Sequence, residues 1–145
     1  MTLTRARLIG IALFVALLAG ACGSGGNDGV TGAQAKYIAQ VDPICKDLQG
    51  KVHDLGSNPG QQAKDVEDAV NRIRSVQKPR DNSEQADVYI AAMQNLYIAL
   101  QDVDQSRQVN DQPRAQRALD TAKTNDQKAA KAAKDYGMKV CSEAL

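Results

Sequence analysis

Apolar residues recur every three or four positions along most of this chain, a spacing that places them on one face of an α-helix. The clearest run comprises Ala86, Tyr89, Ile90, Met93, Leu96, Tyr97, Leu100 and Val103. It follows Ser83, a residue type that commonly caps the start of a helix. From about residue 31 onward, no segment alternates apolar and polar residues as a half-buried strand does. The sequence therefore predicts an all-α fold.

Two further helices are bounded by proline. One is predicted to begin at Asn58-Pro59 and to end before Pro79, because proline is tolerated at the first helical position and stops a helix that approaches it. The other has an apolar stripe, rich in alanine, that begins after Asp111 and Pro113. Small side chains of this kind permit close packing between helices.

The first predicted helix covers the apolar positions between Tyr37 and Leu55 and contains Pro43, whose ring clashes with the carbonyl of Ala39. Either this helix kinks, or Asp42 caps a new helix that has Pro43 at its first position. With this element the chain has four helices joined by short polar connections. We therefore expect an antiparallel up-and-down four-helix bundle.

The amino-terminal segment has the features of a lipoprotein signal peptide. Arg5 and Arg7 precede the apolar stretch Leu8–Leu18, which has the length of a signal-peptide core and is too short to span a bilayer. Ala19-Gly20-Ala21 then leads to Cys22, which we expect to carry the lipid. Because leucine is commonest where Ala19 stands, cleavage after Ala21 by an ordinary signal peptidase is the alternative.

This interpretation divides the chain into three parts. They are a signal peptide over residues 1–21, a lipidated cysteine with a glycine-rich linker over residues 22–33, and a helical domain over residues 34–145. Two or three acyl chains, at ~0.8 kcal/mol per buried methylene, would hold the domain on the membrane. The predicted location is the extracytoplasmic face of the cell membrane.

Cys45 and Cys141 are the two remaining cysteines. In an up-and-down bundle with an even number of helices, the start of the first and the end of the last lie at the same end. Thiols outside the cytoplasm oxidise, so we expect a disulfide between them. Metal ligation is the rival interpretation, but the chain offers a single histidine, His53, and no further thiols. We therefore expect no metal.

No sequence pattern predicts catalysis or nucleic-acid binding. The chain lacks a Gly-x-Ser-x-Gly elbow and a phosphate-binding glycine loop, and His53 beside Asp54 is expected to be a solvated surface residue. Once the signal peptide leaves, 16 basic residues face 17 acidic ones, whereas a nucleic-acid binder needs a cationic excess. We expect neither an enzyme nor a cofactor.

Basic residues gather on one side of the last predicted helix. They are Arg114, Arg117, Lys128, Lys131 and Lys139, and a helical wheel places them within about 100°, opposite the alanine stripe. This side is a candidate contact face for anionic headgroups or an acidic partner. The alternative is that an alanine-rich helix needs charge to stay soluble. Asp126 lies at the edge of the alanine stripe, where we expect a buried polar group.

Two segments resemble those of a known group of proteins. Tyr37-Ile38-Ala39-Gln40-Val41-Asp42-Pro43-Ile44-Cys45 opens the helical part, and Tyr136-Gly137-Met138-Lys139-Val140-Cys141 closes it. Together with the lipid-attachment motif, they resemble the small two-cysteine lipoproteins of high-GC Gram-positive bacteria. Pro43 departs from that pattern, which usually has a helix former there. The resemblance implies a cell-envelope location and no particular reaction.

Two functions fit these expectations. The first is a tethered, non-catalytic interaction or structural module that docks an envelope protein or the membrane through a helical face, and it predicts a filled core with an exposed patch. The second is a binding protein for a small apolar or amphipathic ligand, with Ile90, Met93, Leu96, Tyr97 and Leu100 as cavity walls.

Overall fold

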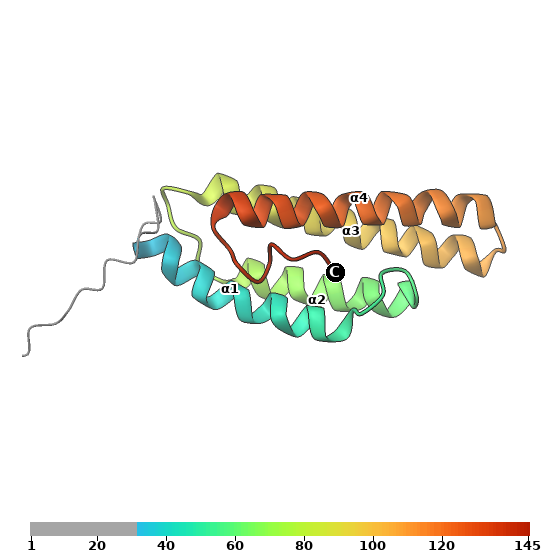
Figure 1. Ribbon diagram of the computed structural model, residues 1–145, viewed down its shortest axis with the longest axis horizontal. Coiled ribbons are helices and arrows are strands. Elements are labelled where there is room, and N and C mark those ends of the chain that lie inside the picture. The colour runs from blue at the N-terminus through green and yellow to red at the C-terminus, as the bar shows by residue number, and fades with distance from the viewer. Residues whose placement is uncertain (1–31) are drawn as a thin grey trace, which may run out of the picture.

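The computed structural model describes residues 32–145, so the predicted signal peptide, Cys22 and most of the predicted linker lie outside the described residues. This part of the chain forms four helices, which are α1 (Gly32–Lys51), α2 (Pro59–Ser75), α3 (Ser83–Gln108) and α4 (Gln112–Tyr136). Within residues 32–145 there is no strand. Consecutive helices pack side by side in a helical bundle, with the most extensive contact between α3 and α4 (Figure 1). The all-α prediction is confirmed.

The helices α2 and α4 begin where the sequence indicates. Asn58 is the N-cap of α2 and Pro59 is its first residue. Asp111 caps α4, and its carboxylate accepts a hydrogen bond of 3.0 Å from the backbone N–H of Arg114. That bond satisfies one of the N–H groups that the first turn of a helix leaves without a partner. Asn58 makes no side-chain capping bond, so the local feature at the start of α2 is Pro59, whereas at α4 it is the Asp111 cap.

The start of α3 differs from the prediction by one residue. Asn82, rather than Ser83, is the N-cap. Its side chain makes no capping bond and instead donates a hydrogen bond of 2.8 Å to the side-chain oxygen of Gln34 on α1. A tertiary contact thus takes the place of a local cap.

Helix α1 runs without interruption through Pro43, so a new start at Asp42 is wrong. A proline inside a helix removes one backbone hydrogen bond and introduces a clash. Packing offsets this cost, because Val41, Ile44 and Cys45 are all buried while Pro43 itself faces solvent. The helix also begins at Gly32, within the segment expected to be linker.

The core contains tyrosine as well as aliphatic side chains. Tyr37, Tyr89 and Tyr136 are among the largest fully buried residues. The rings of Tyr37 and Tyr136 meet edge to face with centroids 5.8 Å apart, a favourable aromatic geometry. Leu96 and Leu100, both 0% exposed, fill the centre from α3.

Residues 137–145, here called the C-terminal strap, follow α4. Gly137 adopts the left-handed conformation with φ of 90°, which ends the helix and reverses the chain. The strap then folds back in the space between α1 and α4, whose backbones do not come into contact with each other (Figure 1). Met138 is 2% exposed and Cys141 is 5% exposed. The strap therefore belongs to the core and links the first and last helices.

Candidate functional site

The disulfide joins Cys45 on α1 to Cys141 on the strap, which confirms the predicted pair. The hydroxyl of Tyr89 lies 3.2 Å from the sulfur of Cys45. Burial raises the pKa of Tyr89, and it raises the pKa of Tyr37 to about 12. These phenols are therefore neutral at physiological pH. Both cysteines are buried, so the disulfide has a structural role.

Hydrogen bonds from α1 hold the first half of the strap, up to the disulfide. The side-chain amide of Gln49 on α1 donates to the carbonyl oxygen of Val140 at 2.9 Å. The Asp42 carboxylate accepts longer contacts from the backbone N–H groups of Lys139 and Cys141, at 3.4 and 3.5 Å. Both side chains belong to α1, so this helix positions the first half of the strap.

Asp126 on α4 holds the other end of the strap. It is 6% exposed, as the sequence predicted, and its carboxylate oxygens lie 3.2 and 3.1 Å from the backbone nitrogen of Leu145, which donates to them. Burial raises the pKa of Asp126 above its ordinary value of 3.8, while the hydrogen bond from Leu145 acts in the opposite direction. Its role is to tie the strap to α4.

The raised pKa of Asp126 predicts a pH-dependent loss of stability. In the unfolded chain the carboxyl ionises near 3.8, whereas in the folded protein it ionises at higher pH. Between these values the folded state binds more protons, so this group's contribution to stability falls as the pH rises through that window. An asparagine side chain at this position would keep an oxygen for Leu145 and cannot ionise. We therefore expect Asp126→Asn to become more stable relative to the wild type on going from pH 3.5 to pH 7.

Urea unfolding at both pH values measures this difference. Asp120→Asn, which removes an exposed carboxylate from the same helix, is the control. A wild type that gained stability over Asp126→Asn at the higher pH would show that ionisation of Asp126 favours the fold, contrary to the structure.

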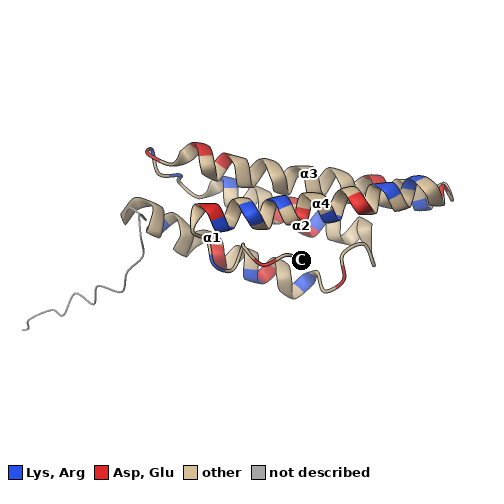
Figure 2. Ribbon diagram, turned by 45° about the horizontal axis from the view of Figure 1, so that its top comes forward, with Lys and Arg blue, Asp and Glu red and all other residues tan. Residues whose placement is uncertain are grey.

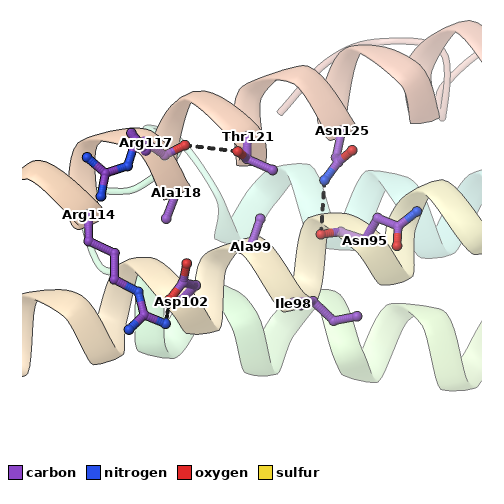
Figure 3. Close-up of a pocket in the computed structure, with 9 residues that line it drawn as sticks. All are labelled: Asn95, Ile98, Ala99, Asp102, Arg114, Arg117, Ala118, Thr121 and Asn125. Atoms are coloured by element: carbon purple, nitrogen blue, oxygen red, sulfur yellow. Dashed lines mark hydrogen bonds and ion pairs between the residues drawn. The ribbon is translucent and has the colours of Figure 1, made fainter.

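Two hollows follow the outer seam between α3 and α4. The first has a volume of about 530 Å³ and is lined by residues that include Ala99, Asp102 and Arg114 (Figure 3). The second has a volume of about 500 Å³, its lining includes Val88 and Ala132, and the surface of that lining is mainly apolar. Asn95 borders both hollows, which lie one after the other along the same seam, and we call the two together the α3/α4 groove.

Four of the five predicted basic-face residues line this groove. Arg114 and Arg117 border the first hollow, and Lys128 and Lys131 border the second. The sequence analysis placed these residues on the side of the helix opposite the alanine stripe. In the structure they lie beside the seam where α4 packs against α3. The prediction is wrong for Lys139, because α4 ends at Tyr136 and Lys139 belongs to the strap.

Ion pairs neutralise two of these cations. Arg114 lies 2.6 Å from a carboxylate oxygen of Asp102 across the seam, and Lys131 lies 2.5 Å from Asp135 on its own helix. Arg117 and Lys128 form no ion pair within residues 32–145. Figure 2 shows the Lys and Arg positions along α4 in blue. The side chain of Asn125 donates a hydrogen bond of 3.1 Å to the backbone oxygen of Asn95, which ties the two walls together.

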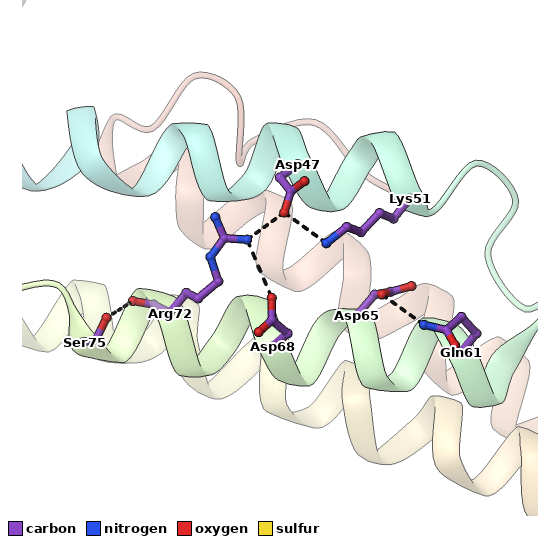
Figure 4. Close-up of polar contacts among 7 residues, drawn as sticks. All are labelled: Asp47, Lys51, Gln61, Asp65, Asp68, Arg72 and Ser75. Carbon is purple, nitrogen blue, oxygen red and sulfur yellow. Dashed lines mark hydrogen bonds and ion pairs between the residues drawn. The ribbon is translucent and has the colours of Figure 1, made fainter.

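A second charged cluster lies between α1 and α2. Asp47 accepts from Arg72 at 2.6 Å and from Lys51 at 3.1 Å, and Arg72 also approaches Asp68 at 3.6 Å (Figure 4). The hydrogen bond from Arg72, followed by that from Lys51, lowers the pKa of Asp47. All four side chains are exposed and mutually paired, so this cluster links α1 to α2 and is sensitive to salt.

The residues proposed as walls of a ligand cavity fill the core. Ile90, Met93, Leu96 and Leu100 are buried, and Tyr97 is partly buried. The hollow beside Met93, next to the disulfide, has a volume of about 10 Å³, which is room for one water molecule. This part of the interior has no room for an organic ligand.

Residues 32–145 offer neither a metal site nor a membrane span. This part of the chain brings together no cluster of three or more His, Cys, Asp or Glu side chains that would suit a metal ion. His53 is exposed just after α1. None of the four helices combines the length and apolarity needed to cross a bilayer.

The sequence prediction missed the apolar part of the groove. Val88 and Ile98 on α3 are 56% and 58% exposed. The signal in the sequence is that both apolar residues fall outside the apolar period of the predicted helix. The sequence does not show that these two residues border a hollow, because that depends on how α3 and α4 pack.

The chain matches no protein-family model, and neither a curated protein nor a solved structure shows significant similarity to it.

Proposed function

We propose that this protein is a lipid-anchored component of the cell envelope, and that its helical domain is a non-catalytic interaction module on the extracytoplasmic face of the membrane. The proposal includes a signal peptide over residues 1–21, acylation at Cys22 and a flexible linker. In it the domain is an antiparallel up-and-down four-helix bundle, and the chain is related to the two-cysteine lipoproteins that it resembles. The buried disulfide supports an oxidising location, where such bonds persist.

The observation that carries the interaction role is the contrast between the core and the α3/α4 groove. The core residues pack against one another, whereas the groove leaves Val88 and Ile98 exposed. Beside them lie Arg117 and Lys128, which form no ion pair within residues 32–145. Exposed apolar side chains with a polar rim are typical of binding surfaces. The alternative, a small-ligand binding protein, needs a cavity where the structure places Met93 and Leu96 in the core.

The anchor is tested by Cys22→Ala. We expect the wild type to enter the detergent phase in a phase-partitioning assay and the variant to enter the aqueous phase, because the variant lacks the thiol that would carry the acyl chains. Ser24→Ala leaves Cys22 in place and is the control. A Cys22→Ala protein that stays with the membrane would contradict the proposed anchor.

The interaction role is tested on the native protein by chemical cross-linking in isolated membranes. Mass spectrometry then identifies the adducts and any small molecule that co-purifies. We expect a reproducible adduct with an envelope protein. A small molecule bound in equal amount, with no protein adduct, would overturn the proposal in favour of the ligand-binding alternative.

A further inference from the structure

The shape of the α3/α4 groove suits an elongated partner. It extends along α3 from Gln85 to Asp102, a separation that corresponds to roughly 26 Å at 1.5 Å per residue. The groove is shallow and open, and two helix surfaces that run side by side form its walls. An α-helix of about 17 residues has the matching length and a convex surface.

The floor of the groove permits close approach of such a helix. Alanine residues from both walls line it, including Ala91 and Ala92 on α3 and Ala132 on α4. Val88 lies in one hollow and Ile98 in the other, ten residues apart on α3, and both are more than half exposed. Small residues flanked by larger apolar ones provide places for the apolar stripe of an amphipathic helix.

The charge of the groove indicates which charge a partner helix should carry. Four cationic and two anionic side chains line the groove, which leaves an excess of two positive charges. The described residues as a whole hold equal numbers of basic and acidic side chains, so the excess is local. Arg117 and Lys128, both on α4, are the groove cations without an ion pair among these residues. A partner with carboxylates along one flank complements them.

We propose that the α3/α4 groove binds an acidic amphipathic helix of a partner protein. Its apolar stripe packs on the alanine floor between Val88 and Ile98, and its carboxylates pair with Arg117 and Lys128. This inference rests on the proposed interaction role and specifies the surface and the chemistry of the partner.

Two other occupants fit the groove less well. A lipid surface favours protruding aromatic and leucine side chains with a clear cationic excess, whereas the groove is concave and contains Asp102 and Asp135. A second copy of the chain that packed groove to groove about a two-fold axis would bring two cationic surfaces together. Neither of these objections applies to an acidic helix.

The test is a selection from a peptide library, with the secreted chain carrying Cys22→Ser as the target. This variant keeps every described residue and lacks the predicted anchor. The library consists of helical peptides of about 18 residues, matched to the groove length, with a fixed leucine and alanine stripe at positions i, i+3, i+4 and i+7. The flanking positions vary among Glu, Lys and Gln. We expect the selected peptides to carry Glu along one flank.

Fluorescence anisotropy then measures the affinity of a selected peptide for groove variants. We expect Arg117→Glu with Lys128→Glu to weaken binding at least tenfold and to bind the Lys version of the same peptide better than the wild type does. Val88→Ser with Ile98→Ser should also weaken binding at least tenfold. Lys46→Glu with Lys123→Glu, two exposed positions outside the groove, is the control and should change it less than twofold.

Several results would overturn the inference. One is selection of basic or uncharged flanks, and another is equal loss of affinity in the groove variants and the control. Binding to phosphatidylglycerol vesicles that the same groove variants abolish, without peptide binding, would assign the groove to the membrane. A dimer broken by these variants would assign it to a second copy. None of these results bears on acylation at Cys22, so failure here leaves the anchor proposal to its own test.

Discussion

Replacing both Cys45 and Cys141 with alanine is expected to lower the free energy of unfolding by about 2–5 kcal/mol. The disulfide closes a loop between residues 96 apart in sequence. Closing a loop of this size restricts the unfolded chain, and the chain-entropy model gives up to ~4.7 kcal/mol for about 100 residues. Folded-state packing adds to the effect, because the bond fixes the strap between α1 and α4, whose backbones do not meet.

Urea unfolding of the oxidised proteins measures this loss. Dithiothreitol is the control, because it should destabilise the wild type to a similar extent and leave the double alanine variant unchanged. In the double alanine variant, the hydrogen-exchange rate should increase most at the backbone amides of the strap, at Met138 and at the alanine that replaces Cys141. A loss of stability below about 1 kcal/mol, less than the usual range for such a bond, would mean that the strap and its hydrogen bonds hold the helices without it.

The second large effect is expected from Leu96→Ala. Leu96 lies at the centre of α3 and is 0% exposed, so its truncation leaves a cavity that the packed helices fill only in part. Substitutions of this kind cost about 2–5 kcal/mol. Thermal or urea unfolding measures the change.

Ile98→Ala provides the matched comparison on the same helix. Ile98 is two residues further along α3 and is 58% exposed, so its loss should change the unfolding free energy by no more than about 0.5 kcal/mol. Similar losses for Leu96→Ala and Ile98→Ala would contradict the orientation of α3. Together with the binding measurements, this pair separates a residue that builds the core from one that lines the α3/α4 groove.

The fold was predictable wherever local chemistry decides it. The apolar period of α3 and the Asn58-Pro59 and Asp111 starts are properties of a few neighbouring residues, and the structure follows them. Pro43 is different, because its local cost is offset by burial of Val41 and Ile44 against other elements. A sequence pattern indicates the cost of such a residue but not the packing that compensates for it.

The groove was predictable in part for the same reason. A helical wheel found Arg114, Arg117, Lys128 and Lys131, since residues on one helix share a face whatever surrounds them. It failed at Lys139 because Gly137 ends α4 two residues earlier. The contribution of α3 through Val88 and Ile98 depends on a contact between helices, which a single-helix pattern does not contain.

The position of the disulfide also sets how the domain responds to mechanical tension. If the domain were pulled from its two ends, the covalent link between Cys45 and Cys141 would carry the force past the polypeptide between them. Force travels through the sulfur atoms, so α2, α3 and α4 stay outside the path that carries the tension. Only the described residues before Cys45 and after Cys141 can be drawn out, and the remainder resists extension even when its helices have melted.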